Sequence, residues 1–148
     1  MSVIYSDAWY DDMKELINGA QGFRKEAPKD HVVMSLEVLG DGSSPYVAAD
    51  DALYFLIEVD DGMVQEFRPL SERFSGKGLQ FRFTAPASIW ESVAAGQTDP
   101  ITAGLRGVIK VRGDMRYLME NADAVKLLID LYGNQVNTEW PKGRPPYA

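Results

Sequence analysis

The stretch WESVAAGQTDPITAGLRGVIKVRG, from Trp90 to Gly113, places an apolar helix, an Asp-Pro break and a short strand one after another. Pro86 suits the first turn of the helix, which is expected to end near Gly96. Asp99-Pro100 begins a second, short helix, and Val108 to Arg112 alternates as a strand. Helices and a strand in such close succession predict a domain that mixes both kinds of element.

Four further strands precede this stretch. His31 to Leu39 alternates and has one fully apolar face. Leu53 to Val59 and Met63 to Phe67 are joined by Asp61-Gly62, the preferred pair for a tight hairpin turn. Leu79 to Thr84 alternates apolar with polar residues as a fourth strand. Together with the strand described above, these segments predict a largely antiparallel five-stranded sheet.

Helices near both ends of the chain are expected to cover one face of this sheet. Ser6 or Asp7 can cap an N-terminal helix whose apolar residues recur at helical spacing, and Gly22 is a plausible stop. Asp114 caps the longest predicted helix, which runs to about Tyr132. Its apolar face is wider than a single surface helix needs.

The predicted fold class is therefore α/β, in the α+β sense: two layers, with the sheet on one side and helices on the other. Residues 1–148 are expected to form one domain, in which 1–30 is an N-terminal helix and linker and 134–148 a proline-rich tail. A chain of 148 residues supports one sizeable core.

Composition excludes several classes of protein. The net charge of −7 argues against a nucleic-acid binder, because that affinity comes mainly from Lys and Arg at phosphates. The absence of cysteine excludes disulfides and thiol catalysis. No segment approaches the ~20 apolar residues that span a bilayer, so no stable membrane insertion is expected. The N-terminal residues lack a secretory signal pattern, and a cytoplasmic location is expected.

The sequence offers no pattern typical of a catalytic or metal site, and we expect neither an enzyme nor a cofactor. His31 is the single histidine and is expected on the surface, at the start of a strand. Acidic pairs such as Asp50-Asp51 and Asp60-Asp61 lack the spacing of a calcium loop. Convergence of carboxylates such as Glu58 and Glu91 stays open, although their spacing does not favour it.

The order and spacing of the residues in the opening stretch resemble the sterol carrier protein family, whose members are small lipid-binding domains. The matching positions are Trp90, Gly96, Asp99-Pro100, Gly107, Lys110, Val111, Arg112, Gly113 and Asp114. The resemblance extends more weakly back to about His31. It implies a sterol-carrier-like fold and a hydrophobic ligand held between sheet and helices.

This resemblance and the apolar periodicity lead to the functional prediction: non-enzymatic binding or transfer of a lipid, such as a fatty acyl chain or a sterol, in a hydrophobic cavity. The alternative is a protein-interaction domain whose apolar groove receives a partner or its own tail, and a homodimer also stays open. The predicted lining consists of apolar residues from the fourth strand onward: Phe81, Phe83, Ile89, Trp90, Val93, Leu105, Val108, Met115, Leu118, Met119, Val125, Leu128 and Ile129.

Overall fold

A computed structural model describes residues 2–27, 29–74, 78–131 and 137–147. Its main sheet has five strands in the order β4-β3-β2-β5-β6. The strands are β2 (Val32–Leu39), β3 (Ala52–Asp60), β4 (Met63–Leu70), β5 (Phe81–Pro86) and β6 (Lys110–Gly113). Every neighbouring pair is antiparallel except β2 and β5, which are parallel. The prediction of a largely antiparallel five-stranded sheet is confirmed.

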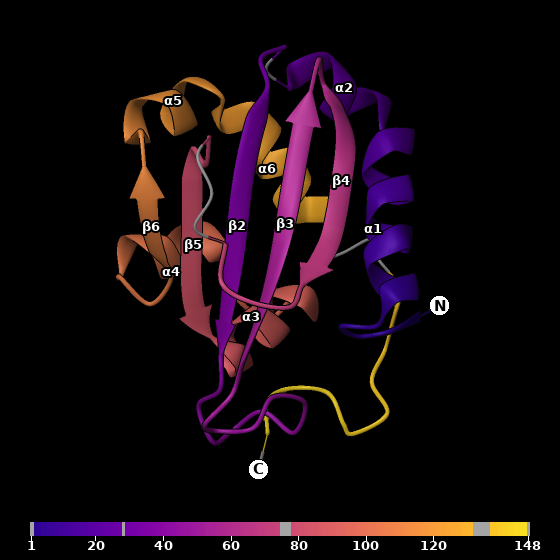
Figure 1. The fold of residues 1–148 in the computed structure, drawn as a ribbon, viewed down its shortest axis with the longest axis vertical. Helices are drawn as coiled ribbons and strands as arrows, with labels where there is room; N and C mark the ends of the chain where they lie inside the picture. Colours follow the sequence, from indigo (N-terminus) through magenta and orange to yellow (C-terminus); the bar gives the residue numbers. More distant parts are fainter. Residues whose placement is uncertain (1, 28, 75–77, 132–136, 148) are drawn as a thin grey trace.

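The helices lie on one side of this sheet, as expected (Figure 1). They are α1 (Asp7–Gly19), α2 (Gln21–Glu26), α3 (Ala87–Ala94), α4 (Pro100–Leu105), α5 (Met115–Glu120) and α6 (Ala122–Asp130). Two very short strands, β1 (Ser2–Val3) and β7 (Thr138–Glu139), pair in parallel and bring the two ends of the chain together. The chain therefore forms two layers, and a separate two-stranded sheet pairs residues near its two ends.

Helix α1 packs along β4 and supplies the most deeply buried part of the core. The Ser6 hydroxyl accepts a hydrogen bond from the Trp9 amide and caps the helix, as its sequence predicts. The buried side chains of α1 are Trp9, Tyr10, Met13 and Ile17, at the expected helical spacing. The ring of Tyr10 lies 5.4 Å from that of Phe55 and 6.0 Å from that of Phe67. This half of the domain has a close-packed aromatic core.

Two predicted helix boundaries differ from the structure. Helix α1 ends at Gly19, and Gly22 lies inside the following helix α2 rather than at a stop. The helix predicted from Asp114 to about Tyr132 is two helices, because Asn121 leaves the helical conformation at φ −111° and ψ 29°. The Asn121 side chain donates to the Tyr117 carbonyl at 2.9 Å, which offers the backbone an alternative to continuing the helix. Tyr132 lies outside the described residues.

Candidate ligand-binding site

The helix-facing side of β5 and β6 carries the aromatic residues that the sequence predicts as lining. The rings of Phe81 and Phe83 stack with centroids 6.2 Å apart and planes at 28°. Phe83 is the cross-strand partner of Val111 on β6. Phe81 is buried, with 2% of its surface exposed, whereas Phe83 and Val111 are only half-buried although both pack against the core cluster. Apolar surface that faces the helices thus keeps contact with solvent here.

Helix α3 lies across the end of this region and contributes buried apolar side chains. Trp90 and Val93 are buried, while Ile89 is half-buried. The Trp90 indole N–H donates to the Glu37 carbonyl at 2.9 Å, which ties the helix to β2. Gly96 takes φ +74° just after the helix, so the predicted stop is confirmed. Trp90 therefore has a structural role in addition to any contact with a ligand.

The remaining predicted lining residues are less enclosed than the sequence suggested. Leu118 on α5 and Leu128 on α6 are half-buried. Met115 and Met119 have 52% and 75% of their surface exposed, and Val108 has 38%. A continuous helix was expected to turn both methionines toward the sheet, but the break at Asn121 separates α5 from α6. The side chains of Leu105, Val125 and Ile129 lie outside the described residues.

The two halves of the domain therefore differ in packing. Under α1 the side chains of Trp9, Met13 and Ile17 have no exposed surface, and Phe55 has 1%. On β5, β6, α3 and α6, several apolar side chains that pack on the core remain partly exposed, namely Phe83, Ile89, Val111, Leu127 and Leu128, whereas Leu16 is the half-buried leucine of α1. Apolar surface in this half is therefore less completely covered by the fold than the surface around Trp9 and Phe55.

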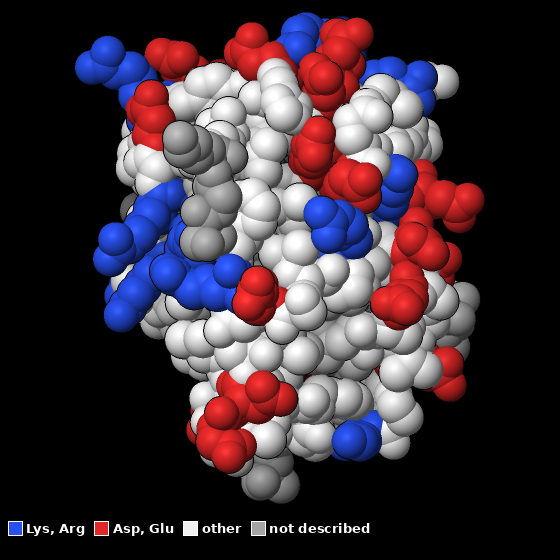
Figure 2. All heavy atoms as spheres, in the orientation of Figure 1, with Lys and Arg blue, Asp and Glu red and all other residues white. Residues whose placement is uncertain are grey.

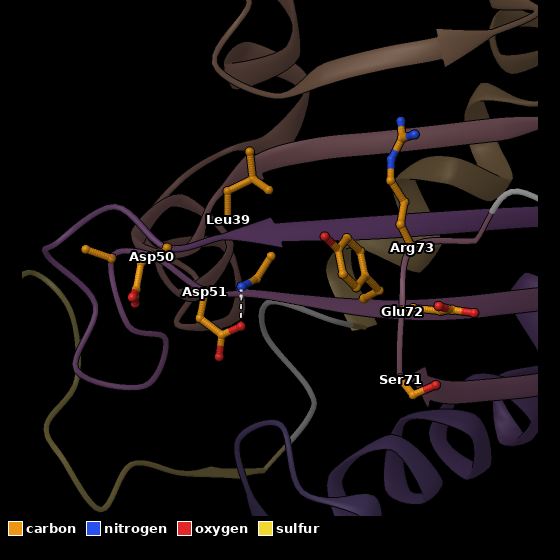
Figure 3. A pocket seen from close by; sticks show the side chains of 10 residues that line it. Leu39, Asp50, Asp51, Ser71, Glu72 and Arg73 are labelled. Atoms are coloured by element: carbon orange, nitrogen blue, oxygen red, sulfur yellow. Dashed lines mark hydrogen bonds between the residues drawn. The ribbon is translucent and has the colours of Figure 1, made fainter.

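An open pocket of about 580 Å³ lies elsewhere, at the end of β2 and β3. Its lining mixes apolar residues with three carboxylates and an arginine: Leu39, Gly40, Ala49, Asp50, Asp51, Ala52, Tyr54, Ser71, Glu72 and Arg73. In Figure 3 the Asp51 carboxylate turns back to accept from the Ala52 amide, at 2.8 Å. None of the predicted lining residues borders this pocket. Its carboxylates do not suit a long apolar chain.

Glu37 is the centre of a buried ion cluster on the outer face of the sheet, and the sequence did not predict it. Its Oε2 accepts from Arg73 Nε at 2.7 Å and Arg82 Nη1 at 2.5 Å, and its Oε1 accepts from the Thr84 hydroxyl at 2.9 Å. Burial alone would raise the pKa of this carboxyl, but the bonds from Arg82, Thr84 and Arg73 hold the pKa below its ordinary value. The cluster crosslinks β2, β5 and the connection after β4.

Glu91 is a second buried carboxylate, and the sequence did not predict the hydrogen-bond cluster around it. It lies on α3 with none of its surface exposed. Its Oε2 accepts from the Tyr5 hydroxyl at 2.7 Å and the Ser44 hydroxyl at 2.8 Å, and its Oε1 accepts from the Tyr147 hydroxyl at 2.6 Å. Burial, and then the bond to Glu91, raise the pKa of Tyr147. The cluster joins the N-terminal segment, the loop after β2 and the C-terminal tail.

The described part of the C-terminal tail docks around this cluster. The rings of Tyr46 and Trp140 meet edge to face at 6.1 Å, and the Tyr46 hydroxyl donates to the Gly143 carbonyl at 2.8 Å. Arg144 Nη2 donates to the Ala95 carbonyl at the end of α3. These contacts are made to the end of α3 and to the loop after β2. They do not involve the half-buried residues of β5 and β6.

The other charged residues considered in the sequence show no catalytic arrangement among the described residues. The side chain of His31 is 54% exposed, as predicted, and its Nε2 lies 2.9 Å from Glu58 Oε1. Glu58 therefore pairs with His31, while Glu91 binds three hydroxyl groups, so these carboxylates have separate partners. Within the described part of the chain, no group of His, Asp and Glu could hold a metal ion. None of the described helices is long and apolar enough to cross a bilayer.

The fold is a two-layer domain in which helices cover one face of a five-stranded sheet. The model of the SCP-2 sterol transfer family matches residues 46–126, more than half of the chain, and the chain belongs to this family. The family and the fold support a function in lipid or sterol binding or transfer in general. No curated protein sequence matches the chain.

Solved structures confirm the fold. A crystal structure of sterol carrier protein 2 has a TM-score of 0.74 at 18% identity, over 90% of this chain and 99% of that one. The solution structure of a conserved hypothetical protein from Thermus thermophilus, described as possibly a sterol carrier protein, has a TM-score of 0.70 at 16% identity, over 92% and 91%. That of a sterol carrier protein domain from Helicoverpa armigera has 0.53 at 18%, over 87% and 94%.

Proposed function

We propose that this protein binds and carries a long apolar ligand, such as a fatty acyl chain or a sterol, without a chemical step. The ligand lies between the sheet and the helices, at the half of the domain formed by β5, β6, α3, α5 and α6. Phe83 and Val111 form the centre of this site, and the half-buried Ile89, Leu118 and Leu128 are expected to surround it.

The observation that carries the proposal is the partial solvent exposure of Phe83 and Val111. These two residues are a cross-strand pair on the side of the sheet that the helices cover. Phe83 and Val111 lie on the helix-facing side of the sheet and are half-buried, whereas Phe55 and Phe67, beside α1, are buried. An apolar ligand in contact with them removes this surface from water. Each buried methylene of an acyl chain contributes about 0.8 kcal/mol, so ten give a gross driving force of about 8 kcal/mol before ordering costs.

A carrier of this kind needs apolar area rather than proton transfer. The polar clusters are consistent with this, because Glu37 is engaged by two arginines and Glu91 by three hydroxyls. Both carboxylates have structural partners. A polar head group of the ligand is expected to remain at the edge of the site, in water.

A matched pair of substitutions tests the placement. Val111→Asp puts a carboxylate against the proposed ligand, whereas Val33→Asp puts the same carboxylate on the outer face of the same sheet at another half-buried valine. Binding of a fluorescent fatty acid should weaken at least about tenfold in Val111→Asp, because an unpaired charge is costly beside an apolar chain. It should stay near wild type in Val33→Asp. Equal affinity in the two variants, both folded by circular dichroism, would contradict the proposed site.

A further inference from the structure

Positive charge is concentrated at one edge of this acidic protein. Residues 106–119 contain four basic residues and one acidic residue, a net charge of +3 in a chain whose net charge is −7. The basic residues are Arg106, Lys110, Arg112 and Arg116. They lie on and around β6, which is one of the two edge strands of the sheet. Figure 2 shows Lys and Arg side chains gathered over β5 and β6, while acidic side chains lie in several patches elsewhere on the visible face.

The side chains of this edge are available to a partner. Lys110 and Arg112 are exposed and lie on the face opposite Val111, and Arg112 is the cross-strand neighbour of Arg82. Among the described residues, no carboxylate lies within 4.0 Å of the Lys110 or Arg112 charge. The nearby Asp114 carboxylate is occupied, because it accepts from the backbone amides at the start of α5. The positive charge of β6 is therefore not neutralised within the fold.

Exposed apolar side chains flank the same strand. The described residues include five large apolar side chains that are exposed, and three of them are Val108, Met115 and Met119. Val108 lies in the turn before β6, and the two methionines lie one turn apart on α5, directly after β6. Figure 1 shows α4 and α5 at the two ends of β6, at one edge of the molecule. Basic and exposed apolar side chains thus share this edge.

We propose that the edge formed by residues 106–119 docks on an anionic lipid surface. Lys and Arg are attracted to the negative surface potential of anionic lipids, and exposed methionine and valine side chains can enter the boundary between head groups and acyl chains. A nucleic acid or an acidic protein would pair with the charges but would leave the methionines in water. A second copy of this chain would bring two positive edges together. The combination of both chemistries favours a lipid surface.

This inference goes beyond ligand binding, because docking on a membrane needs no ligand in the core. It places the molecule with β6 toward the membrane, at the same half of the domain as the proposed ligand site. The negative net charge of the rest of the chain would orient the protein, since the acidic surfaces are repelled by the same lipids.

The test is cosedimentation of the full chain with vesicles of phosphatidylcholine and phosphatidylserine, compared with vesicles of phosphatidylcholine alone. Binding is expected only to the anionic vesicles and is expected to fall as salt is raised. Each basic residue near such a surface contributes about a fivefold factor in partitioning, so Lys110→Gln/Arg112→Gln should lower it about 25-fold. Lys25→Gln/Lys142→Gln changes the net charge equally at exposed positions outside residues 106–119 and should leave partitioning unchanged.

A second variant tests the apolar contribution. Met119→Ser, at a position already 75% exposed, should retain the fold and weaken vesicle binding several-fold. Equal losses in the two glutamine pairs, or no binding of the wild type to anionic vesicles, would overturn the proposal. Salt-sensitive self-association through this edge in light scattering, without vesicle binding, would assign it to a second copy instead. The two proposals can fail separately. If the wild type binds anionic vesicles but not a fluorescent fatty acid, the proposed function is wrong and the membrane proposal stands.

Discussion

Removal of the Tyr147 hydroxyl gives a direct measure of how firmly the C-terminal tail is held. Tyr147→Phe keeps the ring but removes the described donor to Glu91 Oε1, which lies 2.6 Å away. Glu91 has no exposed surface, so water does not replace the lost bond without rearrangement. A buried polar atom without its partner costs about 1–3 kcal/mol. In a domain of this size that loss lowers Tm by roughly 2 to 12 °C.

The effect should be constant across neutral pH. Burial and the bond to Glu91 raise the pKa of Tyr147, so the phenol stays protonated and continues to donate. A raised pKa contributes stability that is fully present below the unfolded value of about 10 and is lost only at higher pH. Calorimetry at several neutral pH values should therefore give the same Tm difference.

Hydrogen exchange locates the change within the molecule. The Lys142 amide donates to the Tyr46 hydroxyl, and the Gly143 amide donates to the Trp140 carbonyl. Both amides lie in the docked tail and should exchange faster in Tyr147→Phe. Tyr54→Phe is the matched control, since Tyr54 is half-buried and has no hydroxyl bond among the described residues. Wild-type Tm and unchanged tail protection in Tyr147→Phe would refute the assignment of Tyr147 as an anchor.

Three further changes test other parts of the fold. The pKa of Glu37 is lowered in the folded protein, so its ionised form adds to the free energy of unfolding above the unfolded pKa of about 4.3, and this stabilisation is lost as pH falls. In urea titrations, the stability difference between wild type and Glu37→Gln should therefore shrink below about pH 4. Gly113→Ala should destabilise by about 1–3 kcal/mol, because φ is +141° and the added Cβ would overlap the Phe81 ring, whereas Gly104→Ala on α4 meets nothing within 4 Å and should be neutral or stabilising in thermal melts. Trp90→Phe should cost about 1–3 kcal/mol through loss of the bond to the Glu37 carbonyl; an unchanged urea midpoint would show that this bond is not needed.

Turn residues and apolar alternation correctly predicted a hairpin turn and a buried strand face. Asp61 and Gly62 adopt φ of 50° and 77°, the backbone that the Asp-Gly pair indicated for the turn between β3 and β4. The apolar face of β2 is buried in the core through Leu36 and Val38, as its alternation predicted. Asn121 was missed, because one asparagine has only a weak helix penalty and a long apolar stripe conceals the break.

The polar clusters could not be read from the sequence because their partners are far apart in the chain. Arg73 and Arg82 are 36 and 45 residues from Glu37, and Tyr147 is 56 residues from Glu91. No local pattern indicates such pairs. The resemblance identified the family, but it did not show which apolar side chains would remain partly exposed. That distinction depends on how closely each helix packs on the sheet.

The central claim is that an apolar ligand lies between the sheet and the helices beside Phe83 and Val111. The most direct test is an isotope-filtered NOE experiment on the protein saturated with a ¹³C-labelled fatty acid. We expect NOEs from the acyl chain to the Phe83 ring and the Val111 methyl groups. Acyl NOEs confined to the outer-face residues Val33 and Tyr54, or no bound fatty acid at saturation, would contradict the claim.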